Sequence, residues 1–146
     1  MVYIIHIKKE MITIRLWHYK LLPILPDKML VSQWRECLAI KRQWEKGTLK
    51  HKLVSYIKNY DKGYFFHYVC EVINEMIQRQ INFNNELASE ILEFSHSKDS
   101  NKYFIYPEHN NRYLKQCLYN LQEKADRGII TQEEWQKIED KFGGVM

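Results

Sequence analysis

The chain has 146 residues, enough for one domain with a sizeable core and too few for two ordinary domains. Apolar residues make up 45% and only five residues are glycine, a composition that excludes global disorder and favours a helix-rich fold. Residues 1–62 hold 13 Lys and Arg against five Asp and Glu, whereas residues 63–146 hold nine against 13, so the basic half is suited to contact with a polyanion.

The first ten residues are set apart from the rest of the chain. They alternate like a strand, and Met11 offers a second start, so we expect an extension over residues 1–10 and one helical domain over residues 11–146. No run reaches 18 apolar residues and no N-terminal run suits a signal peptide. We therefore expect a cytoplasmic protein with no membrane partner.

The segment before the first long helix is predicted to be extended. Residues 13–24 mix aromatic and basic side chains, and Pro23 and Pro26 prevent a continuous helix.

The first long helix is expected over residues 27–45, with Asp27 as its N-cap. Arg35 and Glu36 lie off its apolar stripe, where a solvated helix also carries charge, so their position alone favours ordinary surface charges over functional residues. The stripe, which predicts the core face, consists of Leu30, Trp34, Cys37 and Leu38.

A short helix is predicted over residues 49–57 and a long one over residues 64–80, with a turn over residues 59–63 between them. The long helix carries a wide apolar face that includes Ile77, so we place it at the centre of the core.

Three more helices are predicted over residues 84–94, 109–127 and 131–143. Gly128 is the expected stop of the second, and a capping box at Thr131 begins the third, so the last two form a hairpin.

The three cysteines, Cys37, Cys70 and Cys117, lie in predicted helices without a CxxC pair, so we expect buried apolar residues and neither a disulfide nor a metal site. Together the elements predict an all-α fold. We expect a compact single-domain helical bundle, monomeric, with an extended N-terminal segment packed against the first long helix.

Basic residues are densest between residues 41 and 62, where aromatic side chains are interleaved with them. Cations contact phosphates and rings stack on bases, so this pattern favours nucleic-acid binding over a merely soluble surface. The predicted DNA-contacting residues of this stretch are Lys41, Arg42, Lys50, His51 and Lys52.

Several short motifs occur in a particular order along the chain. They are Arg15-Leu16-Trp17-His18, Leu25-Pro26-Asp27, Gln33-Trp34-Arg35-Glu36-Cys37, the basic segment around His51, the aromatic run Tyr64-Phe65-Phe66-His67, and the stretch from Tyr106 to Tyr113. Their order and spacing resemble the pyrimidine dimer DNA glycosylase family of the endonuclease V type, over about residues 13–121.

The resemblance implies a DNA repair glycosylase with AP-lyase activity on duplex DNA that contains a pyrimidine dimer or another damaged base. Its nucleophile would be the α-amino group of the first residue, with Thr13 near that amine, and Glu36 would manage protons and stabilise developing positive charge. An amine and a carboxylate suffice, so no metal or cofactor is implied. The resemblance also implies DNA contacts by Arg15, His18 and Arg35.

Two other functions stay open on the sequence alone. A non-catalytic basic nucleic-acid-binding module would bind with salt dependence and trap no intermediate. A helical interaction protein, whose charges are only solvated, would show no affinity for nucleic acid at moderate salt. The start residue also matters, because an amine at Met11 would lie next to the motif whereas an amine at Met1 would not.

Overall fold

The computed structural model describes residues 14–100, 102 and 104–146. Helices follow one another through these residues without a strand, which confirms the predicted all-α fold. The α-helices are α2 (Asp27–Glu45), α3 (Lys62–Gln78), α4 (Asn85–Ser95), α5 (Asn111–Asp126) and α6 (Gln132–Phe142), and the 3₁₀ helices are η1 (Tyr19–Leu21), η2 (Ser55–Asn59) and η3 (Gly143–Val145).

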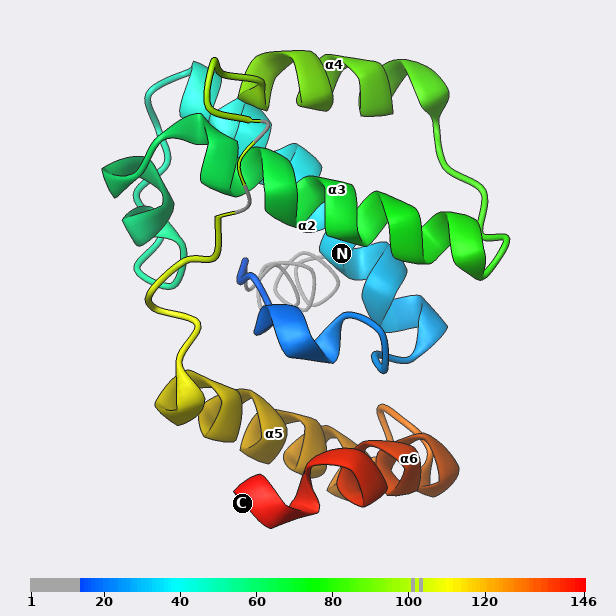
Figure 1. Ribbon diagram of the computed structural model, residues 1–146. Coiled ribbons are helices and arrows are strands. Elements are labelled where there is room, and N and C mark those ends of the chain that lie inside the picture. Colours follow the sequence, from blue (N-terminus) through cyan, green and yellow to red (C-terminus); the bar gives the residue numbers. More distant parts are fainter. Residues whose placement is uncertain (1–13, 101, 103) are drawn as a thin grey trace, which may run out of the picture.

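The N-terminal segment, residues 14–26, lies between two layers of helices. Figure 1 shows it with α2, α3 and α4 on one side and the hairpin of α5 and α6 on the other. Ile14 and Leu16 of this segment belong to the same buried cluster as residues of all five α-helices. The segment is therefore an inner part of the fold, packed against the first long helix as predicted.

Helix α3 lies in the centre of the core, as predicted. It packs against both α2 and α4, and Phe65, Val69 and Val72 on its inner face are fully buried. The prediction that Ile77 lies on the buried face of this helix is wrong, since 56% of this residue is exposed. Ile77 lies at the edge of the buried stripe in the last turn of α3, one turn beyond Ile73.

Three α-helices end in the Schellman arrangement. In each, a residue with positive φ comes after the helix, and the N–H of the following residue donates to the carbonyl five positions before it. Gly128, with φ of 75°, ends α5 as predicted, and the Ile129 N–H then bonds to the Lys124 carbonyl at 2.8 Å. Gln80 ends α3 with φ of 59°, a conformation that costs a side chain energy which glycine avoids.

The predicted N-cap role of Asp27 is wrong. Pro26 occupies the cap position with extended backbone, and Asp27 is the first residue of α2. The Asp27 carboxylate accepts a hydrogen bond from Arg79 at 2.9 Å instead. Side chains do cap the next four α-helices, and these caps are Asp61, Asn84, Asn110 and Thr131, the last in the predicted capping box.

The predicted helix over residues 49–57 is also wrong. Leu49 and Val54 are fully buried while the four residues between them are exposed, and this spacing does not fall on one helix face. A loop fixed at both ends results, in which the Leu53 N–H bonds to Nδ1 of His51 at 3.2 Å. Helix η2 follows the loop, and α3 begins inside the predicted turn.

The three cysteines are free thiols. Cys37 and Cys117 are buried as predicted, whereas Cys70 is only partly buried. Among the described helices, none combines the length and the apolar character needed to cross a membrane.

Candidate active site

One buried side chain, Gln33 of α2, holds the N-terminal segment in place. Its Oε1 accepts the N–H of Trp17 at 2.7 Å, and its Nε2 donates to the carbonyl oxygen of Arg15 at 2.8 Å. The hydroxyl of Tyr68, on α3, lies 2.9 Å from the same Oε1 and 2.6 Å from the Trp17 carbonyl. The backbone on both sides of Leu16 is thus fixed to α2 and α3.

Glu36 lies one turn after Gln33 on α2. Its Oε2 accepts a hydrogen bond from Nε2 of Gln33 at 2.9 Å. Burial raises the pKa of the Glu36 carboxyl to about 8, and the nearby cations Arg15 and Lys124 oppose this rise only in part. An α-amino group titrates in the same range, about 7.7–8.0. Glu36 is therefore able to give and to take a proton near neutral pH.

Two cations lie near the Glu36 carboxyl and come from opposite parts of the chain. The Arg15 guanidinium lies over the Trp17 ring, 5.0 Å from its centroid. Lys124 comes from α5, and its pKa is lowered by burial and by repulsion from Arg15. A carboxyl that titrates near neutrality beside two cations suits an anionic substrate that undergoes acid–base chemistry.

Two buried histidines pack against each other, His18 of the N-terminal segment and His109 from the stretch before α5. Nδ1 of His18 accepts the Lys20 N–H at 3.2 Å, and Nδ1 of His109 accepts the Tyr19 N–H at 3.2 Å. Burial lowers the pKa of His18 to about 4 and that of His109 to about 3, so both rings are neutral at physiological pH. His18 is 1% exposed, so its ring is not available at the surface for the predicted DNA contact.

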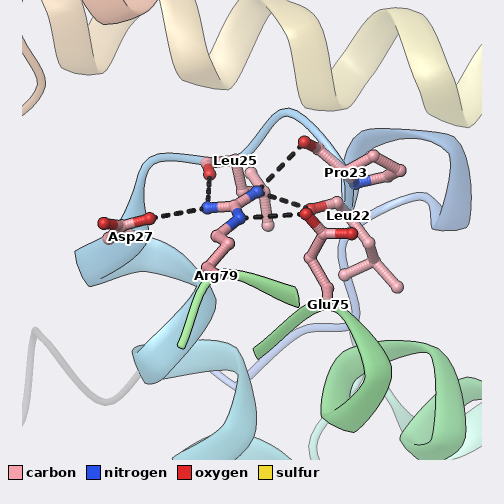
Figure 2. A network of polar contacts seen from close by, with 6 residues as sticks. All are labelled: Leu22, Pro23, Leu25, Asp27, Glu75 and Arg79. Atoms are coloured by element: carbon pink, nitrogen blue, oxygen red, sulfur yellow. Dashed lines mark hydrogen bonds and ion pairs between the residues drawn. The ribbon is translucent and has the colours of Figure 1, made fainter. Parts of the chain in front are cut away.

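The turn that leads into α2 is fastened by Arg79, which follows the last residue of α3. Figure 2 shows its guanidinium enclosed by oxygens of this turn and of α3. Each of its five N–H groups has an acceptor. The acceptors are the carbonyls of Leu22, Pro23 and Leu25, at 3.2, 3.0 and 2.6 Å, and the carboxylates of Asp27 and Glu75, both at 2.9 Å.

The remaining predicted DNA-contacting residues differ in availability. Lys41 forms an ion pair with Glu45 at 2.9 Å, and its Nζ lies 5.9 Å from the centroid of the Phe94 ring, so it is engaged within the protein. Exposed cationic or titratable side chains are found on α2 and in the loop after it, and these are Arg35, Arg42, Lys50, His51 and Lys52.

Thr13, predicted to lie near the catalytic amine, is outside the described residues. The neighbouring part of the chain is well fixed. Ile14 is 3% exposed, and the Arg15 carbonyl shares Nε2 of Gln33 with the Glu36 carboxyl. In the part of the chain that the structure describes, no three His, Cys, Asp or Glu side chains gather as a metal site would require.

The sequence model of the family described as "Pyrimidine dimer DNA glycosylase" matches residues 14–89, more than half of the chain. The chain belongs to this family. The match covers the N-terminal segment, α2 and α3, and therefore includes Gln33 and Glu36 of this glycosylase-family protein. The resemblance expected as far as residue 121 extends past the matched range. No curated protein and no solved structure matches the chain.

Sequence reasoning missed Gln33, Arg79 and Lys124 as parts of this region. Gln33 carried a signal, because it lies three residues after Leu30 and four before Cys37, on the buried side of the helix. A polar residue at such a position needs hydrogen-bond partners. Arg79 and Lys124 carried no comparable signal, because the groups that they approach are far away in the sequence.

Proposed function

We propose that this chain is a pyrimidine dimer DNA glycosylase with AP-lyase activity, which acts on duplex DNA through an imine formed by an N-terminal α-amine. Glu36 is its acid–base group and charge stabiliser. The main support is the Glu36 carboxyl, with its pKa of about 8, held beside the Arg15 peptide two residues from Thr13. Both Arg15 and Glu36 lie inside the matched range.

The first step replaces the damaged base. The unprotonated amine attacks C1′, so that an N–C1′ bond forms and the C1′–base bond breaks, with the electron pair and a proton going to the base. The amine loses a proton, the C1′–O4′ bond opens, and O4′ takes up a proton to give the imine. As a carboxylate, Glu36 stabilises the positive charge that develops on the sugar, and it carries the transferred protons.

The second step cuts the strand. The imine withdraws electrons from C2′, which loses a proton, and the C3′–O bond breaks with its electron pair leaving on the phosphate. Water then hydrolyses the imine and restores the amine. Arg15 and Lys124, the cations near Glu36, would hold the phosphate beside the damaged nucleotide.

Borohydride trapping tests the imine. Chains beginning at Met1 and at Met11 are incubated with a duplex that carries a cyclobutane pyrimidine dimer, reduced, and compared by intact mass and peptide mapping. We expect a covalent adduct on the terminal amine of at least one form. Salt-sensitive binding without any adduct would overturn the lyase mechanism and support the non-catalytic binding module, and an adduct on a lysine would overturn the role of the terminal amine.

The DNA-binding surface is tested by charge reversal in the loop after α2. Lys50→Glu with Lys52→Glu should weaken binding of any duplex at least tenfold and flatten the salt dependence, by about 0.9 in slope for each phosphate that is no longer neutralised. Affinity measured between 50 and 200 mM salt checks this. Lys137→Glu with Lys141→Glu, exposed on α6, changes the net charge equally and serves as the control. If the affinities of the two variants depend equally on salt concentration, the DNA does not bind at the loop after α2.

A further inference from the structure

The amide nitrogen of Gln33 joins two parts of the candidate site. It donates to the Arg15 carbonyl at 2.8 Å and to Oε2 of Glu36 at 2.9 Å. These two acceptors lie on different elements, the N-terminal segment and α2. One planar group therefore sets the position of the catalytic carboxyl and of the peptide that leads towards the amine.

The other end of the same amide fixes its orientation. Oε1 of Gln33 accepts the Trp17 N–H at 2.7 Å, so a flipped amide would bring two N–H groups against each other. Gln33 is fully buried, which leaves no water to compensate such a flip. Its two N–H groups are thus committed to Arg15 and Glu36.

The arrangement also distinguishes the two oxygens of Glu36. Oε2 accepts an N–H and so takes the part of a carbonyl oxygen when the carboxyl is neutral, which leaves the acidic proton on Oε1. The charged groups that face this carboxyl are Arg15, from the N-terminal segment, and Lys124, from α5. Both are cations, so each stabilises the charged form of the carboxyl.

We propose that Gln33 is a positioning residue that directs the proton of Glu36 to Oε1 and locks this oxygen in register with the N-terminal segment. The inference rests on the proposed function, in which Glu36 exchanges protons with the substrate. An N–H donated to a carboxyl favours its charged form. Loss of this donor therefore makes Glu36 harder to ionise and leaves its carboxyl free to rotate.

The decisive variant is Gln33→Met in the full chain, with two readouts. The titration midpoint of Glu36, followed by NMR of ¹³C-labelled Glu side chains and assigned with Glu36→Gln, should move to higher pH by about 1–2, because the variant loses the N–H that favours the charged carboxylate. The pH profile of single-turnover imine trapping should move in the same direction, with a rate at least tenfold lower and unchanged duplex affinity.

Two controls distinguish the loss of the Gln33 hydrogen-bond donor from a general loosening of the core. Tyr68→Phe removes a partner from the acceptor side of Gln33 and keeps both donors, so it should leave the Glu36 midpoint in place. Gln43→Met makes the same substitution on α2 two turns after Glu36 and should change nothing. Equal shifts in Gln33→Met and Tyr68→Phe would overturn the proposal.

A third variant keeps the proposal testable if Gln33→Met does not fold. Gln33→Glu preserves shape and an acceptor for Trp17, and places a second carboxyl against Glu36, so the two should titrate as a coupled pair with one midpoint above that of the wild type. An unmoved midpoint overturns the role of Gln33 while wild-type trapping still supports the lyase. Absence of wild-type trapping overturns the lyase, and the NMR titration then still tests the hydrogen bond.

Discussion

Arg79 and Gln33 both connect the N-terminal segment to the helices, and they do so in different ways. Arg79 places a charge among five acceptors, two of which are carboxylates within 2.9 Å. Gln33 makes its connection with a neutral amide, and the carboxyl that it contacts has a pKa raised to about 8.

The difference separates a structural from a chemical use of buried polarity. Opposite charges in direct contact hold each other ionised, which fixes geometry and leaves no proton to exchange near neutral pH. A neutral donor holds a carboxyl in place without keeping it ionised. We therefore expect substitutions at Arg79 to change stability, and substitutions around Gln33 to change chemistry and its pH dependence.

Glu36→Gln should have the largest effect. The amide keeps the size and the hydrogen-bonding capacity of the carboxyl and loses its charge and its proton transfer, so strand cleavage should fall by about 10²–10³-fold or more with lesion binding retained. Single-turnover cleavage and a binding titration on the same duplex measure this. Glu45→Gln, later on α2, is the matched control, and equal cleavage by the Glu36 variant and the wild type would remove Glu36 from the mechanism.

Arg79→Met should destabilise the fold by roughly 3 kcal/mol, because it leaves three carbonyls and two carboxylates without their donor. Urea unfolding measures this. Arg127→Met is a close control, because Arg127 follows the last residue of α5 as Arg79 follows that of α3. Arg127 faces a glutamate four residues earlier, at 3.8 Å, with a side chain 68% exposed. It should change stability by less than about 0.5 kcal/mol. Similar losses in the two variants would contradict the assigned role of Arg79.

The pH dependence of stability tests the same comparison at Glu36, the carboxyl that the neutral amide of Gln33 contacts. The folded pKa of Glu36, about 8, is above its ordinary value of 4.5, so the stability that its protonation contributes is complete below pH 4.5 and is lost as pH rises through 8. Glu36→Gln lacks this loss. Between pH 4.5 and pH 9, the free energy of unfolding of this variant should therefore rise by roughly 2–4 kcal/mol relative to that of the wild type. Chemical unfolding at both pH values measures this. A difference that does not vary with pH would mean that Glu36 ionises as an exposed carboxyl does.

Gln80→Gly should have the smallest effect and the opposite sign. Glycine adopts the positive φ of this position without steric cost, so the variant should be more stable by about 1 kcal/mol. Because Gln80 lies next to Arg79 and away from the acid–base chemistry, the trapping rate should stay as in the wild type. Thermal unfolding and trapping together check this, and a changed rate would show that the two regions are coupled.

The helices could be predicted from the sequence because their signals are local. The apolar stripe of α2, the Gly128 stop and the Thr131 capping box each depend on residues within a few positions of one another. The stop at Gln80 carried no such signal, since glutamine seldom adopts a positive φ. The Asp27 cap failed because the cap position lies one residue earlier than expected, at Pro26, and the Asp27 carboxylate contacts the distant Arg79 instead.

The candidate site was only partly visible in the sequence. Glu36 was found through the order of motifs, and the family match supports that assignment without testing it. Its pKa and the approach of Lys124 depend on how α5 covers the N-terminal segment, which no local pattern encodes. The burial of His18 has the same origin, since an aromatic and basic segment fits a surface as well as a core.

The hydrogen bonds that cover the N-terminal segment have a consequence for how the protein is made. His109 accepts the Tyr19 N–H, and Tyr113 donates to the Leu16 carbonyl. Contacts between such distant parts of a chain form slowly, and during synthesis they wait for the later partner. In a nascent chain that has emerged only to residue 89, the N-terminal segment has its contacts with α2 and α3 and lacks those with the side formed by α5 and α6. The N-terminal segment is thus covered on both sides only after α5 and α6 have been synthesised.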